Sequence, residues 1–274
     1  MPWSIIDFRK KEESGLSGQG HCDMEINKRD RVLNIAHRGA SGHAPENTLA
    51  SFCKAIELGT DMIEFDVHRS VDGHLIVVHD RRLTRVGEKR WAVDMMTLEE
   101  LKTIDVGSWF GKGYAGERIP TLRDILKLTR GRIELNLEIK SGGSPYDLIE
   151  KPIIGLLREY GMLDKTLVSS FDYTYLENIR EAEKSVRIGL LVDKGGFKAS
   201  LNKALSLYAE AINITDKILS KKVIEMAKAE GLKLYVYTVD DAADMERYIE
   251  MGVDGIFTNY PDRLGRLISA RETQ

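Results

Sequence analysis

The feature of this sequence that most constrains its fold is a regular alternation of strand-like and helical segments. From residue 32 onwards, short runs rich in Val, Ile and Leu recur, and helical patterns separate most of them. The strand-like runs are 32–37, 62–67, 75–79, 133–139, 166–171, 187–192, 211–215, 234–239 and 255–259. Strands that alternate with helices predict parallel strands joined by helical crossovers, which is an α/β fold.

One pair of runs leaves no room for a crossover helix. Runs 62–67 and 75–79 are joined through VDGH (71–74), and Asp-Gly is a typical two-residue hairpin turn. Parallel neighbours need a connection of a dozen residues or more, so we expect this pair to be antiparallel. The remaining eight strand–helix units in about 240 residues predict a (β/α)8 TIM barrel.

The sequence also predicts how this domain is bounded and interrupted. Residues 1–30 are polar and lack sustained periodicity, so we expect a partly disordered N-terminal extension. The segment 31–274 is expected to be a single barrel domain. A small insertion at about 81–132 follows the second strand, and it contains helical patterns of its own at 97–104 and 121–129.

Composition excludes several classes of partner. The net charge of −3 and the pI near 6.1 give no reason to expect nucleic acid or an anionic membrane surface. No apolar run approaches the ~18 residues of a membrane span, and the first residues are too weakly apolar for a secretory signal. Cys22 and Cys53 lack metal-site spacing and are expected to be unpaired. We therefore expect a cytoplasmic protein without stable membrane insertion.

Charged residues occupy one face of two predicted strands. Side chains alternate between faces along a strand, so Glu138 and Lys140 share a face in IELNLEIK (133–140). Glu64 and Asp66 share a face in the same way. If the aliphatic faces pack on the outer helices, these charged groups point into the barrel. Acids near the C-terminal ends of barrel strands are typical of active-site residues.

Three carboxylates inside one barrel would repel one another strongly. At ~5 Å and an effective dielectric constant of ~20, each pair costs about 3 kcal/mol. Protons or a cation must offset this cost, and ligation by oxygen alone suits Mg²⁺ or Ca²⁺ better than zinc. We expect one such divalent ion on Glu64, Asp66 and Glu138, with Mn²⁺ as a further option. The alternative is that Glu138 merely pairs with Lys140.

Histidines offer candidates for proton transfer. All six lie within the first 79 residues, and His37 ends the first predicted strand. If Asp72 and Gly73 form a two-residue loop, paired residue numbers in the hairpin sum to 145. This register predicts that His79 lies directly opposite Asp66.

Six segments, taken in order, resemble conserved motifs of one enzyme family. The segments are AHRGASGHAPENTLASF (36–52), IEFDVHRSVDGHLIVVHD (63–80), ERIPTL (117–122), NLEIK (136–140), YTVD (237–240) and GIFTNYPD (255–262). They resemble motifs of the glycerophosphodiester phosphodiesterase family, and the resemblance runs from about residue 32 to the C-terminus. One four-letter motif alone would be weak, but six in order are specific.

The resemblance implies a TIM-barrel enzyme that uses a divalent metal to hydrolyse glycerophosphodiesters to sn-glycerol 3-phosphate and an alcohol. By this resemblance the metal ligands are Glu64, Asp66 and Glu138, the acid/base histidines are His37 and His79, and the phosphate-binding residues are Arg38 and Lys140. By analogy with the family, His37 is the base and His79 the acid. The nucleophile is either the neighbouring glycerol hydroxyl or water.

Two further positions are candidates for substrate contact. Phe171 ends a predicted strand, where it either lines the ligand site or belongs to the core. Tyr237 stands where the family often has Trp, so we expect a more polar pocket. A second departure is the segment 85–87, Arg-Val-Gly, where the family often has Arg-Thr-Thr; we expect little effect on the chemistry.

Other residues near the motifs have two possible interpretations each, one functional and one structural. Glu46 or Asn47 either braces the site or only begins a helix. The insertion aromatics Trp109, Phe110 and Tyr114 either cover the pocket as a lid or pack the insertion on the barrel.

Two other functions remain open from the sequence. One is a phospholipase D-like enzyme for lysophospholipids or sphingolipids, and the other is a non-catalytic barrel that binds phosphodiesters. We expect a small-molecule glycerophosphodiester as the substrate, no nucleic-acid partner, and a monomer or homodimer as the assembly.

Overall fold

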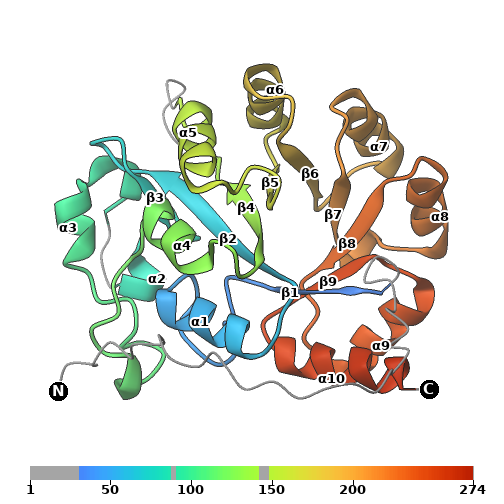
Figure 1. Cartoon of the computed structure of the whole chain (residues 1–274), viewed down its shortest axis with the longest axis horizontal. Helices are drawn as coiled ribbons and strands as arrows, with labels where there is room; N and C mark the ends of the chain where they lie inside the picture. The colour runs from blue at the N-terminus through green and yellow to red at the C-terminus, as the bar shows by residue number, and fades with distance from the viewer. Residues whose placement is uncertain (1–30, 88–90, 142–147, 274) are drawn as a thin grey trace, which may run out of the picture. The chain divides into compact units, whose positions relative to one another are not determined.

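Eight parallel strands close into a barrel in the computed structural model, which describes residues 31–87, 91–141 and 148–273 (Figure 1). The eight barrel strands are β1 (Leu33–Ala36), β2 (Met62–Arg69), β4 (Glu134–Ile139), β5 (Thr166–Ser170), β6 (Arg187–Val192), β7 (Ala211–Thr215), β8 (Lys233–Tyr237) and β9 (Gly255–Thr258), and a further strand, β3 (Leu75–Val77), pairs with β2. Their order is β1-β9-β8-β7-β6-β5-β4-β2, and pairing of β1 with β2 closes the barrel. β3 is antiparallel to β2, so the predicted (β/α)8 barrel with a hairpin arm is confirmed.

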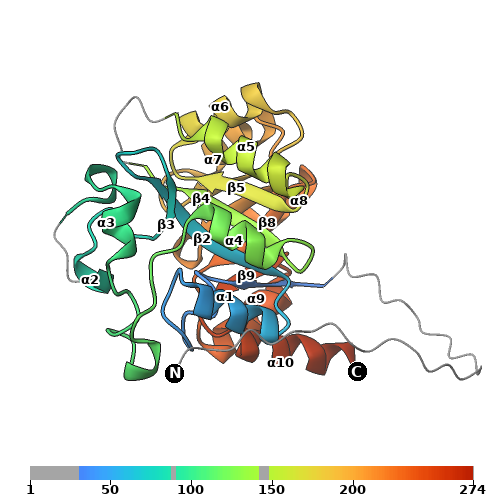
Figure 2. The same ribbon diagram turned by 60° about the vertical axis from the view of Figure 1, so that its left-hand side comes forward.

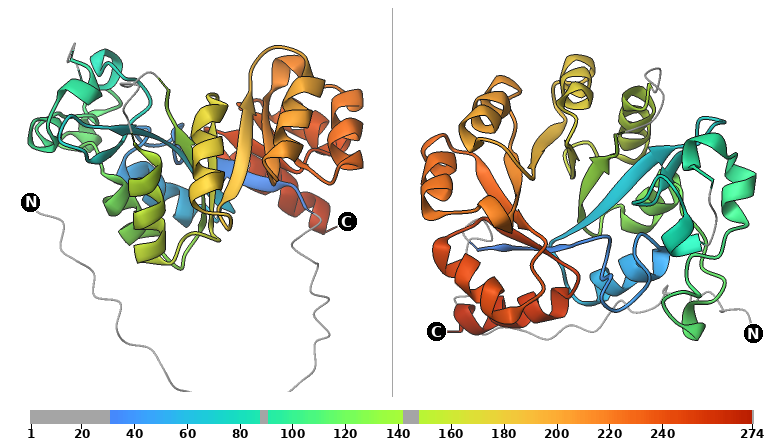
Figure 3. Two further views of the ribbon diagram at one scale, coloured as in Figure 1. Left: turned by 90° about the horizontal axis from the view of Figure 1, so that it is seen from above. Right: turned by 180° about the vertical axis from the view of Figure 1, so that it is seen from behind.

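The helices surround the strands (Figure 3). They are α1 (Leu49–Glu57), α2 (Thr84–Gly87), α3 (Leu98–Lys102), α4 (Leu122–Thr129), α5 (Glu150–Tyr160), α6 (Tyr173–Ala182), α7 (Phe197–Ser206), α8 (Lys221–Ala229), α9 (Ala242–Met251) and α10 (Pro261–Glu272), with 3-10 turns η1 (Val93–Met95), η2 (Lys112–Tyr114) and η3 (Asp216–Ile218). Among the residues described, no helix combines the length and apolar character needed to cross a membrane.

The two faces of the barrel strands separate as the alternation predicts. Phe65 and Leu137 lie in the main core, together with residues of the surrounding helices, and both are fully buried. The inward face begins with an apolar cluster that includes Tyr235 and becomes polar towards the C-terminal ends. There Asn136 Nδ2 donates to Ser169 Oγ at 2.8 Å, which is one of the hydrogen bonds that satisfy buried polar groups inside the barrel.

The segment between β3 and β4 has two parts. Ten buried residues between 76 and 119, including Leu101, form a core separate from that of the barrel. The second helical pattern expected in the insertion, α4, instead packs Leu122 and Ile125 into the main core (Figure 2). α4 is therefore the crossover helix between β2 and β4. The extension expected at residues 1–30, including Cys22, lies outside the described residues.

The predicted hairpin register is wrong by one residue. Val67 pairs with Val77, and Arg69 pairs with Leu75, so paired numbers sum to 144 rather than 145. The reason is the turn, in which Gly73 adopts a φ of +90° as the last residue of a three-residue loop.

Backbone hydrogen bonds define this longer turn. The Gly73 N–H donates to the Ser70 carbonyl at 3.0 Å, and the Ser70 N–H donates to the His74 carbonyl at 2.9 Å. Asp66 therefore lies opposite Val78, whose N–H donates to the Asp66 carbonyl at 3.1 Å. The expected direct pairing of His79 with Asp66 does not occur, because this register places Val78 opposite Asp66.

We predict opposite stability effects for two glycine substitutions. Gly73→Ala should lower the free energy of unfolding by about 1 kcal/mol, because alanine is strained at positive φ. Gly155→Ala, on α5, should raise it by roughly 0.5–1 kcal/mol, because an added Cβ meets no atom within 4 Å. Urea denaturation measures both values. A neutral Gly73→Ala variant would contradict the role of this turn.

Candidate active site

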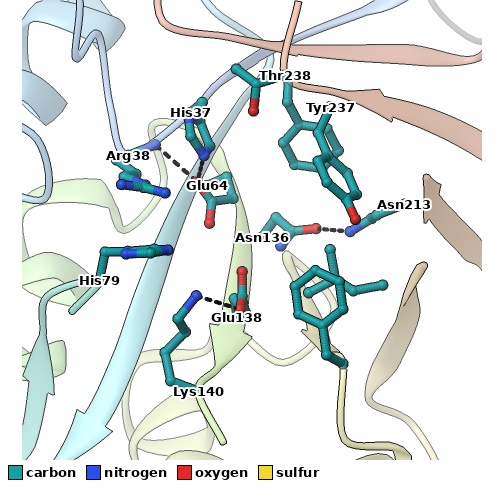
Figure 4. A pocket seen from close by; sticks show the side chains of 13 residues that line it. His37, Arg38, Glu64, His79, Asn136, Glu138, Lys140, Asn213, Tyr237 and Thr238 are labelled. Atoms are coloured by element: carbon teal, nitrogen blue, oxygen red, sulfur yellow. Dashed lines mark hydrogen bonds and ion pairs between the residues drawn. The ribbon is translucent and has the colours of Figure 1, made fainter. Parts of the chain in front are cut away.

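A cavity of about 240 Å³ opens at the C-terminal ends of the barrel strands (Figure 4). The sequence-predicted site residues that line it are His37, Arg38, Glu64, His79, Glu138, Lys140, Phe171 and Tyr237. Asp66 lies beneath this lining and is 1% exposed. The structure thus brings together residues that are 200 positions apart in the sequence, as parallel strands of a closed barrel require.

Three carboxylates form the centre of the cavity floor. Glu64, Asp66 and Glu138 are all buried, and each offers one oxygen within 4.8 Å of those of the other two. Asp66 Oδ1 is buried without a hydrogen bond, although Lys140 Nζ lies 3.2 Å away. An unsatisfied carboxylate oxygen beside two others is a donor set that suits a hard divalent cation. The residues therefore fit the metal that the sequence analysis expects.

Burial and mutual repulsion shift the pKa values of these acids apart. Burial, followed by the charges of Asp66 and Glu138, raises the pKa of Glu64 well above its ordinary value. Burial and the charge of Asp66 raise the pKa of Glu138 to about 7. Burial would also raise the pKa of Asp66, but Lys140 and Arg38 outweigh it and hold that pKa low. Asp66 is thus the anion that the two cations stabilise.

Arg38 and Asn47 brace the carboxylates from the loop between β1 and α1. The Arg38 backbone N–H donates to Glu64 Oε2 at 2.9 Å, and its guanidinium lies 3.5 Å from Asp66 Oδ2. Asn47 Nδ2 donates to the same Asp66 oxygen at 2.8 Å. Arg38 and Asn47 both have positive φ, 56° and 55°, in the left-handed region that non-glycine residues other than Asn and Asp seldom adopt. Glu46 accepts from Arg38 Nη1 at 2.9 Å, so the bracing interpretation holds for Glu46 and Asn47.

His37 is oriented by an amide. Its Nδ1 lies 2.8 Å from Asn259 Oδ1, and Asn259 Nδ2 donates to Asp240 Oδ2 at 2.6 Å. Because Asp240 can only accept, the Asn259 oxygen must face His37, so His37 donates from Nδ1. Nε2 then presents its lone pair towards the cavity, 4.0 Å from Glu64. Burial and the charge of Arg38 lower the pKa of His37 to about 4, which keeps it neutral.

His79 is oriented by a carboxylate instead. Its Nδ1 donates to Asp80 Oδ1 at 2.8 Å, which directs Nε2 into the cavity. Burial lowers the pKa of His79, although the charge of Asp66 and the bond to Asp80 act against this shift. Asp80 in turn accepts from Arg85 Nε at 2.7 Å. The segment 85–87, expected to stand apart from the chemistry, therefore contacts the support of a site residue through Arg85.

Sequence reasoning assigned no role to Asn259, Asp240 or Asp80. All three lie within the motif segments quoted above, and that position was the available signal. The alternation of faces could not reveal them, because they follow the strands and reach the site through loop geometry.

Aromatic rings form the opposite wall of the cavity. Phe171 is 40% exposed, so it is not a core residue, and its ring lies edge-on to Tyr237 at 6.3 Å. The Tyr237 hydroxyl donates to the Val192 carbonyl at 3.0 Å. This donor is therefore used by the backbone, and the more polar pocket expected at Tyr237 stays a prediction.

The insertion aromatics do not line this cavity. Trp109 and Tyr114 each pack edge-on against Phe110, at 5.6 and 5.4 Å between ring centroids. The Tyr114 hydroxyl donates to the His43 carbonyl at 2.8 Å. Of the two interpretations, these contacts favour packing of the insertion on the barrel over a lid.

Comparison with known proteins agrees with this geometry. Residues 37–263 match the model of the glycerophosphoryl diester phosphodiesterase family. This chain belongs to that family. A glycerophosphodiester phosphodiesterase of Caldanaerobacter subterraneus subsp. tengcongensis is 40% identical over 239 residues, which cover 87% of this chain and 98% of the relative. An enzyme of the same description from Bacillus subtilis is 33% identical, over 85% of each chain.

Solved structures of the glycerophosphoryl diester phosphodiesterase family share the fold. An Oleispira antarctica phosphodiesterase in complex with the product sn-glycerol-3-phosphate superposes with a TM-score of 0.82 and 30% identity, covering 87% of this chain and 96% of that one. A glycerophosphodiester phosphodiesterase from Agrobacterium tumefaciens gives a TM-score of 0.74 and 30% identity, over 85% and 98% of the two chains.

We predict that divalent-metal affinity falls as the pH is lowered. The metal must displace protons from Glu64 and Glu138, whose pKa values are raised, to about 7 for Glu138. Affinity should therefore weaken about tenfold per pH unit for each proton displaced below that value. Calorimetric titration with Mg²⁺ or Mn²⁺ at pH 6 and pH 8 measures the change.

Glu134→Gln is the matched control, since Glu134 begins the strand that carries Glu138 and pairs with Arg187 at 2.8 Å, away from the cavity. This variant should retain the pH dependence, whereas Glu138→Gln should reduce it. Equal affinity at both pH values in the unaltered protein would contradict protonated carboxylates in the metal-free site.

Proposed function

We propose that this protein is a glycerophosphodiester phosphodiesterase that releases sn-glycerol 3-phosphate and an alcohol. The observation that carries the proposal is a single cavity that holds three carboxylates, two histidines and two cationic side chains. Membership of the family, and relatives that bear this activity in their names, support the same reaction. The product seen in the Oleispira antarctica enzyme supports glycerol 3-phosphate as the phosphate-bearing product.

In this proposal Glu64, Asp66 and Glu138 hold one divalent ion, with Mg²⁺ or Ca²⁺ as the first candidates and Mn²⁺ as a further one. When bound, such an ion supplies positive charge to the phosphoryl oxygens. The fit rests on three buried oxygen donors whose oxygens lie within 4.8 Å. The absence of nitrogen or sulfur donors in this set argues against zinc.

Arg38 and Lys140 bind the phosphate in this mechanism. Lys140 Nζ donates to Glu138 Oε1 at 2.7 Å and is held on the same side of the cavity as Arg38 (Figure 4). Arg38 presents a guanidinium fork that matches two phosphate oxygens. Their positive charges favour the charge that develops on those oxygens during bond cleavage.

The partners of the two histidines support a division of roles. His37 faces a neutral amide and is uncharged, so Nε2 can accept a proton as the general base. His79 donates to the carboxylate of Asp80, which acts against the lowering of its pKa by burial and favours the imidazolium that donates a proton to the leaving oxygen. The nucleophile is either the neighbouring glycerol hydroxyl, which would form a cyclic phosphate, or water. Running the reaction in H₂¹⁸O while trapping cyclic glycerophosphate distinguishes them, because the absence of any cyclic species would rule out the hydroxyl.

Phe171 and Tyr237 bind the carbon skeleton of the substrate in this proposal. Their rings offer an apolar wall across the cavity from the charged groups. This arrangement would hold a polyol carbon chain while the phosphate lies on Arg38 and Lys140.

The proposal also includes a cytoplasmic location and a monomeric or homodimeric state. Cell fractionation measures the location, and gel filtration measures the oligomeric state.

We predict that His37→Ala and His79→Ala each lower kcat at least ~100-fold, the scale of general acid/base catalysis. Steady-state release of glycerol 3-phosphate measures this loss. His74→Ala serves as the control because His74 lies on the exposed hairpin with half of its side chain in solvent. Near-normal turnover in both active-site variants would refute the assignment.

A panel of substrates tests the reaction itself. We expect glycerol 3-phosphate release from glycerophosphocholine or a related glycerophosphodiester, abolished by EDTA and restored by Mg²⁺, Mn²⁺ or Ca²⁺. Preferential cleavage of lysophosphatidylcholine would instead indicate the phospholipase D-like reaction. Substrate binding without turnover under every metal would indicate a non-catalytic barrel.

A further inference from the structure

One guanidinium joins the insertion to the loop that precedes α1. Arg85 lies on α2, where its side chain is 43% exposed. Its Nε donates to Asp80 Oδ2 at 2.7 Å, while Nη1 and Nη2 donate to Glu46 Oε2 at 2.5 Å and Oε1 at 2.8 Å. Three N–H groups of one planar fork therefore hold two carboxylates that are 34 residues apart in the sequence.

Each of these carboxylates also holds a proposed active-site residue. Asp80 accepts from His79 Nδ1 at 2.8 Å, and Glu46 accepts from Arg38 Nη1 at 2.9 Å. Hydrogen bonds thus run without a break from His79 to Arg38, with Arg85 in the middle. We propose that Arg85 is a positioning residue, which orients the general acid and the phosphate-binding arginine through the two carboxylates between them.

This inference rests on the proposed function, because it assumes that His79 and Arg38 act on the phosphodiester. The charges explain why a cation is needed at this point. Glu46 is 12% exposed, and burial would raise its pKa, but hydrogen bonds from Arg85 and the charge of Arg38 keep it ionised. Without Arg85, two carboxylates near the cavity would lose the cation that they share.

Loss of Arg85 would affect His79 and Arg38 to different extents. Asp80 is 30% exposed, so without Arg85 it can turn into water, and His79 then loses the acceptor that fixes its ring and tautomer. Glu46 retains its bond to Arg38, so the phosphate-binding end loses only part of its support. We therefore expect the proton-transfer step to suffer more than substrate binding.

Attachment of the insertion to the barrel does not depend on Arg85 alone. The insertion has its own core, and the Tyr114 hydroxyl already ties it to the His43 carbonyl at 2.8 Å. Arg81 provides a matched control in the same segment. It binds Asp94 with two hydrogen bonds at 3.0 and 2.6 Å, is 44% exposed, and does not line the cavity.

The experiment compares two leaving groups in the full-length protein loaded with Mg²⁺. Glycerophosphoethanol needs a proton on its leaving oxygen, whereas glycerophospho-p-nitrophenol releases a stable anion without one. For Arg85→Ala we expect kcat on the ethyl diester to fall at least ~tenfold, which is part of the ~100-fold contribution of a general acid. On the nitrophenyl diester kcat should fall less than ~3-fold, because that leaving group needs no proton. KM should rise by a similar factor for both, because Arg38 binds the phosphate of both.

Arg81→Ala should keep kcat within about twofold of the unaltered protein on both substrates, since a surface ion pair contributes little. Arg85→Lys should recover only part of the loss on the ethyl diester, because an ammonium cannot reproduce the fork. Equal losses on both leaving groups in Arg85→Ala, or the same loss in Arg81→Ala, would overturn the proposal. If Arg85→Ala does not fold, the same comparison of leaving groups in Arg85→Lys decides.

A double-mutant cycle tests whether Arg85 acts through Asp80. Asp80→Asn combined with Arg85→Ala should lower kcat on the ethyl diester no further than the more damaging single substitution. Fully additive losses would contradict action through this carboxylate. Failure of the proposed function is distinguishable, because the unaltered protein would then release no glycerol 3-phosphate before any variant is compared.

Discussion

The mutual repulsion of three buried carboxylates is the constraint on which the rest of the active site depends. Glu64, Asp66 and Glu138 cannot all be ionised in so small a buried space without positive charge beside them. The protein meets this constraint in part with Arg38 and Lys140, which hold Asp66 as an anion. The pKa values of the other two acids are raised by burial and by the neighbouring carboxylates, as expected for a site short of positive charge. A divalent cation supplies that charge in the proposed mechanism.

The backbone around the carboxylates reflects the same requirement. Arg38 and Asn47 adopt a left-handed conformation that places an N–H on Glu64 and an amide on Asp66. Strain of this kind persists where the surrounding contacts over-determine it. The packing of α1 and the closure of the barrel by β1 and β2 thus secure the positions of the proposed metal ligands.

Each proposed acid/base histidine is oriented by hydrogen bonds that do not involve the three carboxylates of the proposed metal site. His37 is supported by Asn259 and Asp240, which lie just after the last two strands of the barrel. His79 is supported by Asp80 and, through Arg85, by the insertion. One side of the chemistry therefore depends on the barrel alone, and the other depends on how the insertion is attached.

Local patterns predicted the strands and the inward direction of their acids, because side-chain alternation is a property of one strand. They failed where position depends on a turn or a neighbour. Gly73 lengthens the hairpin loop by one residue and changes the register, yet His79 still lines the cavity. Tyr237 is polar as a residue type, but its hydroxyl donates a hydrogen bond to the Val192 carbonyl.

The sequence by itself determined the eight-unit α/β barrel, the set of acids and histidines, and their resemblance to one phosphodiesterase family. Those properties are encoded in periodicity, spacing and residue type, which act over a few neighbouring residues. Only the tertiary structure decided that a neutral amide faces His37, that a carboxylate faces His79, and that Arg85 joins Asp80 to Glu46. The contacts of His37, and that of Arg85 with Glu46, form between side chains far apart in the chain, so no pattern among neighbouring residues encodes them.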